Sequence, residues 1–168
     1  MTSLAPYDAV LVASYGGPDG PDAVLPFLRN ATAGRGIPDA RLAEVGAHYA
    51  LFGGVSPIND RNAELVEALA AELAARGVRL PVVVGNRNWR PYVADALVEL
   101  ADGGAKRVLA VFTSAYGSSS GCRQYREDIE RALAATERQL DEIRIDHETV
   151  RRRLEVEREK AVETVQMD

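Results

Sequence analysis

The 168-residue chain has very little cysteine, and this limits the kinds of site it can hold. Cys122 is the single cysteine, which excludes an internal disulfide and a metal site built from cysteines alone. No apolar run reaches the roughly 18 residues of a membrane-spanning helix. The opening MTSLAPYDAV has neither the basic flank nor the long apolar core of a secretion signal. These absences predict a soluble, cytoplasmic protein.

Basic residues are outnumbered by acidic ones, and histidine is scarce. The chain has 20 Lys and Arg against 25 Asp and Glu, and its net charge of −5 argues against nucleic acid as a partner. The two histidines, His48 and His147, are far apart in the sequence, and no paired carboxylate motif accompanies either one. A Ser-His-Asp or Cys-His nucleophile is therefore not supported.

Three short apolar runs rich in valine stand out from this background. They predict strands buried on both faces over 8–14, 80–85 and 107–113. Helical patterns occupy the intervals between and after them: 22–30, 39–51, 62–76, 92–101 and a segment that begins near Cys122. Strands alternating with helices predict an α/β fold, specifically a flavodoxin-like or Rossmann-like half-domain with a parallel sheet of three or four strands.

Chemically versatile side chains follow each of these strands. Tyr15 follows the first, Arg87 and Asn88 follow the second, and Ser118–Ser120 and Tyr125 follow the third. Because the carboxyl ends of parallel strands meet at one edge of a sheet, these residues are expected to form a site. A phenol there can stack on a flat ligand, donate a hydrogen bond or ligate a hard metal, or can simply pack. A guanidinium suits carboxylates.

The turn after the first strand, GGPDGP at 16–21, does not match the GxGxxG fingerprint of dinucleotide-binding proteins. Its prolines remove backbone donors, and Asp19 and Asp22 add negative charge that would repel a phosphate. The turn therefore argues against nucleotide binding.

The last forty residues change character. From Ile129 to Leu154 a mostly apolar series alternates between spacings of four and three. It holds Ile, Leu, Thr, Leu, Ile, His, Val and Leu at positions 129, 133, 136, 140, 143, 147, 150 and 154, and neither Gly nor Pro occurs after Gly121. This pattern predicts an α/β domain over 1–135 and a charged helical tail over 136–168 that could pair as a coiled coil and mediate self-association. Residues 142–146 (EIRID) also alternate as a strand does, so a fourth strand followed by a helix is the alternative.

Five motifs together resemble one family. LVASYGGPDGP, TAGRGIP, HYALFGGVSPIN, GNRNWRPY and FTSAYGSSSGCRQYREDI are similar, in this order and spacing, to the amino-terminal half of ferrochelatases. The similarity is greatest to the actinobacterial coproporphyrin III type and covers about Tyr7 to Ala135. Ferrochelatases insert ferrous iron into a porphyrin in haem biosynthesis. They fold as two similar α/β halves with the macrocycle in the cleft between them.

The resemblance implies which residues meet the porphyrin, here coproporphyrin III or protoporphyrin. The implied contacts are Tyr15, Arg35, Ser56, Arg87, Asn88 and Tyr125. Tyr15 faces the ring and approaches or ligates the iron, while Arg35, Ser56 and Tyr125 bind propionates or line the cleft. Many relatives carry an arginine at the position of His48, so a shorter, largely neutral histidine departs from the pattern there. Fe²⁺ enters as a substrate.

One part of the family pattern has no counterpart in this chain. The histidine and glutamate that take up protons and admit metal belong to the family's second half, so the chain is expected to hold no catalytic residue and no iron–sulfur cluster. We therefore expect weak or no iron insertion. A truncation, a divergent paralogue and a frame change near Thr136 all remain open. The alternative functions are porphyrin or haem binding without reaction, and an interaction fragment that works through the tail.

Overall fold

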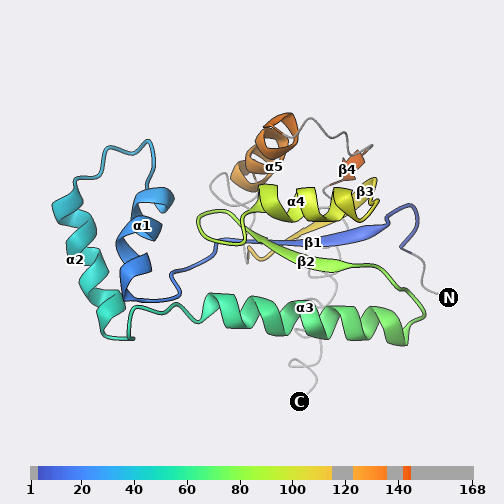
Figure 1. The fold of residues 1–168 in the computed structure, drawn as a ribbon, viewed down its shortest axis with the longest axis horizontal. Coiled ribbons are helices and arrows are strands. Elements are labelled where there is room, and N and C mark those ends of the chain that lie inside the picture. Colours follow the sequence, from blue (N-terminus) through green and yellow to red (C-terminus); the bar gives the residue numbers. More distant parts are fainter. Residues whose placement is uncertain (1–3, 115–122, 136–141, 145–168) are drawn as a thin grey trace, which may run out of the picture.

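The fold is known from a computed structural model that describes residues 4–114, 123–135 and 142–144 (Figure 1). Nine elements follow one another along these residues. They are β1 (Ala9–Ser14), α1 (Pro21–Ala31), α2 (Asp39–Ala50), α3 (Ile58–Ala75), β2 (Val82–Asn86), α4 (Val93–Asp102), β3 (Arg107–Phe112), α5 (Gln124–Ala135) and β4 (Glu142–Arg144).

The strands form one parallel sheet in the order β2-β1-β3-β4. β1 is central, and its Val12 lies opposite Val84 of β2 and Val111 of β3. This order is that of flavodoxin-like folds, in which the chain changes direction between β1 and β3 and ligands bind at that point. The predicted parallel α/β sheet is therefore confirmed, and the three predicted strands lie within two residues of the observed ones.

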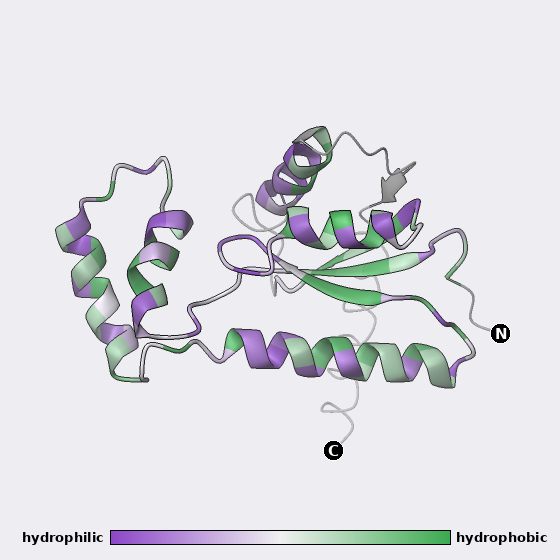
Figure 2. Cartoon of the chain, viewed as in Figure 1, coloured by the Kyte–Doolittle hydropathy of each residue, from purple (hydrophilic) through white to green (hydrophobic). Residues whose placement is uncertain are grey.

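The main core lies between the sheet and the layer formed by α4 and α5. α3 covers the opposite face along β2 and β1 (Figure 1). Leu11 of β1 and Val108 of β3 pack in one buried cluster with Leu97 of α4 and Ile129 of α5. The strands are the most continuously hydrophobic part of the molecule (Figure 2), as expected for parallel strands with helices on both faces.

α1 and α2 form a helical hairpin that extends beyond the carboxyl ends of the strands (Figure 1). Its apolar faces enclose a second, smaller buried cluster, consisting of Val24, Phe27, Leu28 and Leu42. The chain then returns to the sheet through the α2–α3 connection, where Val55 forms a β-bridge with Asp19. The hairpin therefore begins and ends next to the turn that follows β1.

The structure corrects one prediction. Residues 142–144 form β4, which pairs in parallel with the edge of β3, so a single helix from Ile129 to Leu154 is wrong at these residues. The alternative of a fourth strand is confirmed. The exposed edge of β3 offers backbone hydrogen-bond partners, and this long-range pairing outweighs the heptad pattern. Residues 136–141 and 145–168, the rest of the predicted tail, lie outside the described residues, and so does Cys122.

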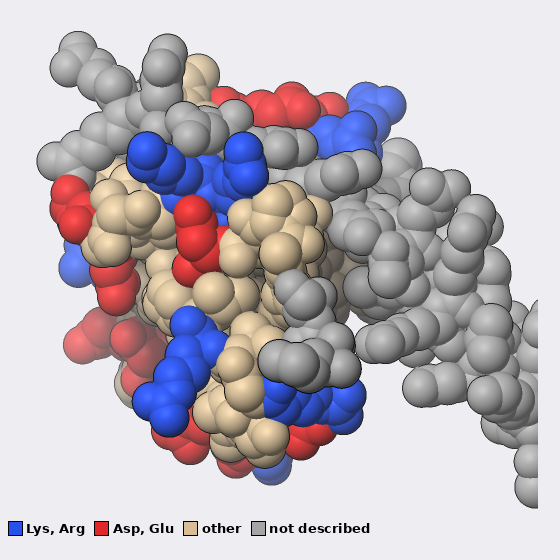
Figure 3. Space-filling model, turned by 90° about the vertical axis from the view of Figure 1, so that its right-hand side faces the viewer, with Lys and Arg blue, Asp and Glu red and all other residues tan. Residues whose placement is uncertain are grey.

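The amino ends of the strands form the opposite edge of the sheet. Lys, Arg, Asp and Glu side chains are intermixed on that end of the molecule (Figure 3). Asp8, just before β1, accepts hydrogen bonds from the backbone N–H groups of Lys106 and Arg107 at 3.0 and 2.9 Å, which ties the start of β3 to β1. In the parts of the chain that the structure describes, every helix is too short or too polar to cross a membrane.

Candidate functional site

The candidate site begins at the turn after β1. Tyr15 is 43% exposed there, and the two glycines that follow it allow other segments to approach closely. A Cβ on Gly16, whose φ is +77°, would lie 2.8 Å from Cβ of Asn86, and one on Gly17 would lie 2.4 Å from Cβ of Ser56. Side chains at these two positions would therefore push apart the segments that surround Tyr15.

The β2–α4 loop, residues 86–92, holds the backbone of Tyr15. Asn88 donates twice to the Tyr15 carbonyl oxygen, from its backbone N–H and from Nδ2, each at 3.1 Å. Its own carbonyl accepts a hydrogen bond of 3.4 Å from Nδ2 of Asn30 in α1. Asn88 is only 6% exposed, and these contacts hold the turn after β1 against the β2–α4 loop.

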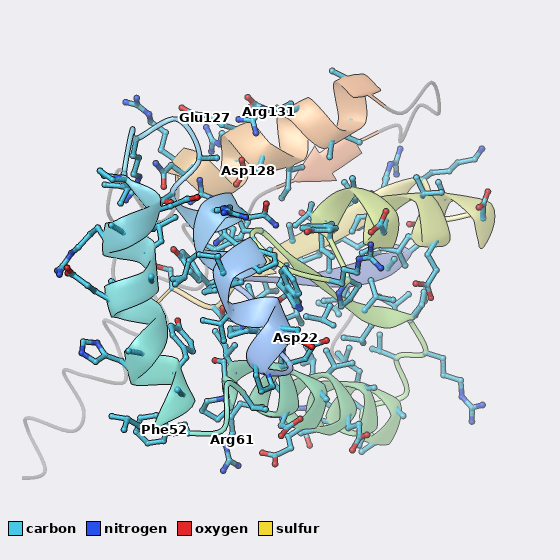
Figure 4. All side chains as sticks on the ribbon, turned by 60° about the vertical axis from the view of Figure 1, so that its left-hand side comes forward. Asp22, Phe52, Arg61, Glu127, Asp128 and Arg131 are labelled. Atoms are coloured by element: carbon cyan, nitrogen blue, oxygen red, sulfur yellow. The ribbon has the colours of Figure 1, made fainter. Side chains whose placement is uncertain are left out.

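Arg87 connects the same loop to α5. Its Nε lies 2.5 Å from Oδ2 of Asp128, and its Nη1 donates to Oε1 of Gln124 at 2.6 Å. Its guanidinium carbon lies 5.9 Å from the centre of the Tyr125 ring. Asp128 lies on the side of α5 turned toward the sheet, whereas Glu127 and Arg131 lie on the outer side (Figure 4). The guanidinium is therefore already paired with groups of the protein.

Tyr125 is buried between β3 and this arginine. Its ring stacks on Phe112 with the ring centres 5.1 Å apart. Burial, with smaller contributions from Tyr15 and Asp128, raises the pKa of Tyr125 to about 12, while Arg87 and a hydrogen bond with Thr113 act in the opposite direction. The phenol therefore keeps its proton at neutral pH and can act as a hydrogen-bond donor. Arg87 lies over the Tyr125 ring, and the next residue, Asn88, donates to the Tyr15 carbonyl, so residues 86–92 bring the two tyrosines to one edge of the sheet.

An aromatic cluster closes the hairpin side of this rim. The Phe27 ring makes edge contacts with Tyr15, Tyr49 and Trp89, with ring centres 6.0–6.3 Å apart. Nε1 of Trp89 also donates to Oδ1 of Asp19 at 3.2 Å. Burial, and then the nearby Tyr15, raise the pKa of Tyr49.

Tyr49 was missed by the sequence analysis, although a signal for it was present. It follows Leu42 and Val45 at helical spacing on the apolar face of α2, and that face packs against α1. The same stripe that makes α2 amphipathic thus directs a phenol toward Tyr15.

The six residues implied by the resemblance fall into three groups. Tyr15, Arg87, Asn88 and Tyr125 come together through the contacts above. Ser56 lies beside them against Gly17, and its backbone N–H donates to the Pro18 carbonyl at 2.8 Å.

Arg35 forms the third group. It is exposed in the loop between α1 and α2. That loop follows Asn30, whose Nδ2 donates to the Asn88 carbonyl, and the Arg35 backbone N–H donates to the Thr32 carbonyl at 3.0 Å.

The described residues offer few groups for metal or proton chemistry. Among them, no cluster of three or more His, Cys, Asp or Glu side chains could hold a metal ion. His48, the one histidine they include, is exposed on α2. Ser118–Ser120 lie outside the described residues.

A family comparison decides the relationship. The ferrochelatase family model matches residues 7–151. The chain belongs to the ferrochelatase family. It is 59% identical to the coproporphyrin III ferrochelatase of Streptomyces coelicolor over 137 residues, which are 82% of this chain and 36% of that protein. It is 58% identical to that of Leifsonia xyli over 153 residues, which are 88% of this chain and 39% of that protein.

These ferrochelatase relatives are considerably longer than this chain. The chain spans less than two fifths of the length of the relatives it matches. The family match also continues past Ala135, where the resemblance was expected to end, and includes β4. The strand that corrects the predicted helix is thus part of the ferrochelatase-like segment.

Proposed function

We propose that the carboxyl edge of this sheet is the porphyrin-binding part of a ferrochelatase that inserts ferrous iron into coproporphyrin III. The observation that carries the proposal is that Tyr15, directly after β1, and Tyr125 of α5 are both contacted by the β2–α4 loop, through Asn88 and Arg87, in a chain of this family. Its relatives are named coproporphyrin III ferrochelatases, which supports that porphyrin over protoporphyrin.

The proposed roles follow from the position of each side chain. Tyr15, exposed at the strand end, faces the macrocycle and approaches the iron. Tyr125, which keeps its proton, donates a hydrogen bond to a propionate, and Ser56, which lies against Gly17 in the turn after Tyr15, assists. Arg35 meets a carboxylate at the periphery of the ring, since a large planar ligand can extend from β1 toward the end of the hairpin.

Apolar surface for the ring lies in the α2–α3 connection. Leu51, Phe52 and Val55 are exposed there, and Val55 pairs with Asp19 next to the turn after β1. Figure 4 shows Phe52 just beyond the carboxyl end of α2. Contact with a flat apolar ligand would remove these side chains from water.

Proton removal is the step for which the described residues are least equipped. Metal insertion requires a base for the two pyrrole protons, and His48 lies exposed on α2. We therefore propose that the 168-residue chain binds coproporphyrin III but inserts iron weakly or not at all. We also propose a cytoplasmic location, which the single cysteine supports.

The test is a titration of coproporphyrin III with the purified chain, followed by the Soret absorption band. We expect a saturable shift, and Tyr15→Phe should weaken binding roughly tenfold because it removes a hydroxyl at the centre of the rim. Tyr7→Phe is the matched control, since the same change before the start of β1 should leave binding unaltered. An unchanged Soret band in the native chain would rule out the proposal.

A second candidate function is binding of an iron porphyrin without reaction. It is favoured by the exposure of Tyr15, whose phenolate is a hard ligand for ferric iron. Ferric coproporphyrin III bound to the native chain should then show a tyrosinate-to-iron charge-transfer band that Tyr15→Phe abolishes. Iron insertion at a rate comparable to that of a full-length relative would instead establish catalysis by this chain.

A further inference from the structure

Arg87 lies in the proposed porphyrin site, but the groups around it suggest a role other than gripping the ligand. We infer that Arg87 is a positioning residue, which holds α5 and thereby sets the place of the Tyr125 phenol, and that it does not bind a ligand carboxylate itself. This inference rests on the proposed function for its account of binding, whereas its account of Tyr125 rests on the described contacts alone.

The first step concerns the N–H groups of the guanidinium. Nε lies 2.5 Å from Oδ2 of Asp128, an ion pair in which that oxygen accepts no hydrogen bond. Nη1 donates to Gln124, and the Arg87 side chain is only 20% exposed. A ligand carboxylate would have to compete with Asp128, whose side chain is 16% exposed and would lose its Arg87 partner. Arg131 also contacts Asp128, through Oδ1 at 3.1 Å, but it is far more exposed. Leaving a half-buried carboxylate short of a partner opposes such an exchange.

The second step concerns what these contacts fix. Arg87 contacts three residues within the first five positions of α5: Gln124, Tyr125 and Asp128. The backbone N–H of Arg87 donates to the carbonyl of Ser14, the last residue of β1, at 2.9 Å. Arg87 therefore connects α5 directly to the strand that carries Tyr15.

The third step concerns the Tyr125 ring itself. Phe112 stacks on it, and the Arg87 guanidinium lies within cation–π distance of the same ring. An aromatic ring held by two neighbours, one from β3 and one from the β2–α4 loop, has little freedom to tilt. Removing Arg87 should therefore change the environment of the phenol even when no ligand is present.

Direct carboxylate binding and positioning predict different responses to the loss of Asp128. If Arg87 grips a propionate, Asp128→Asn releases the guanidinium and binding stays the same or tightens. If Arg87 positions Tyr125, Asp128→Asn and Arg87→Gln both loosen α5, and the double variant is no worse than either single one. A positioning role also predicts that Arg87→Gln adds nothing further in a Tyr125→Phe background.

The experiment measures coproporphyrin III binding to the full chain carrying Arg87→Gln, Asp128→Asn, both changes, or Arg90→Gln. Arg90 is the matched control, because it is an exposed arginine of the same loop. We expect the first three variants to bind roughly tenfold more weakly and Arg90→Gln to match the native chain. Weaker binding by Arg87→Gln together with unchanged or tighter binding by Asp128→Asn would overturn the inference.

A second measurement does not depend on the porphyrin. The Tyr125 ring resonance in ¹³C-tyrosine-labelled protein, assigned with Tyr125→Phe, should move in Arg87→Gln and in Asp128→Asn but not in Arg90→Gln. If it stays in place in both, the positioning role is refuted, whatever the binding data show.

If Arg87→Gln does not fold, Gln124→Met removes one Arg87 contact and should move the same resonance. If the native chain does not bind coproporphyrin III, the proposed function is refuted. The Tyr125 ring resonance in Arg87→Gln and Asp128→Asn then tests the positioning role by itself.

Discussion

The two hydrophobic clusters of this chain differ in how much structure surrounds them. The sheet cluster, which contains Leu11, Leu97 and Ile129, is enclosed by three strands and by α4 and α5. The hairpin cluster around Phe27 has only α1 and α2, with Tyr49 and Trp89 packed against it. The same burial of apolar side chains thus yields a large core in one region and a small one in the other.

The difference shows what determines the shape of the candidate site. Tyr15 lies at the boundary between the two regions. Nδ2 of Asn30 in α1 donates across it to the Asn88 carbonyl and to the Tyr92 hydroxyl of the β2–α4 loop. Nε1 of Trp89 in the same loop donates to Asp19 in the turn before α1. Arg87 and Tyr125 are positioned by elements that pack in the large sheet core. Arg35 lies in the α1–α2 loop, so its position depends on the packing of the small hairpin core.

The largest expected effect is in the sheet cluster. Leu97→Ala should lower the free energy of unfolding of the whole chain by roughly 3–5 kcal/mol, because it leaves a cavity in the larger core. Glu99→Ala, an exposed position on the same helix, is the control and should change it by less than about 0.5 kcal/mol. Denaturant unfolding measures both. Equal effects of the two changes would show that this core does not dominate stability.

A smaller and more local effect is expected in the hairpin. Phe27→Ala should cost roughly 2–3 kcal/mol, since the ring is buried but its cluster has room to relax. Hydrogen exchange should become faster in α1 and α2 while β1, β2 and β3 keep their protection. Leu25→Ala, a half-buried neighbour, should give a weaker change. Loss of protection in hairpin and sheet together would mean that the two regions unfold as one unit.

The pH dependence of stability isolates Tyr125, which lies on the sheet side and stacks on Phe112 of β3. Its pKa in the folded chain is raised to about 12, so above the usual tyrosine value of about 10 the unfolded state loses the proton first. The stability that the neutral phenol contributes is complete below pH 10 and is lost as pH rises to about 12.

Tyr125→Phe should remove this slope. The native chain should lose about 2 kcal/mol more than the variant between pH 10 and 12, as measured by denaturant unfolding. Tyr7→Phe should retain the full slope. Parallel pH profiles of the native chain and Tyr125→Phe would contradict the assigned pKa.

The sequence was sufficient for most of the sheet because the buried strands form continuous valine-rich runs. It left β4 open, because residues 142–144 fit both a heptad and an alternating pattern and only pairing with β3 decides between them. The position of Tyr15 could be predicted from its place after a strand. The structural roles of Arg87 and Asn88 could not be predicted, because their hydrogen-bond partners lie 37–73 positions away in the chain.

The most direct test of the central claim is a map of amide chemical-shift changes as coproporphyrin III is added to ¹⁵N-labelled chain. The largest shifts should fall at the carboxyl edge, in the turn after β1, in the β2–α4 loop and at the start of α5. Shifts confined to the amino edge around Asp8 and Lys106, or an unchanged spectrum, would show that this rim is not where a porphyrin binds.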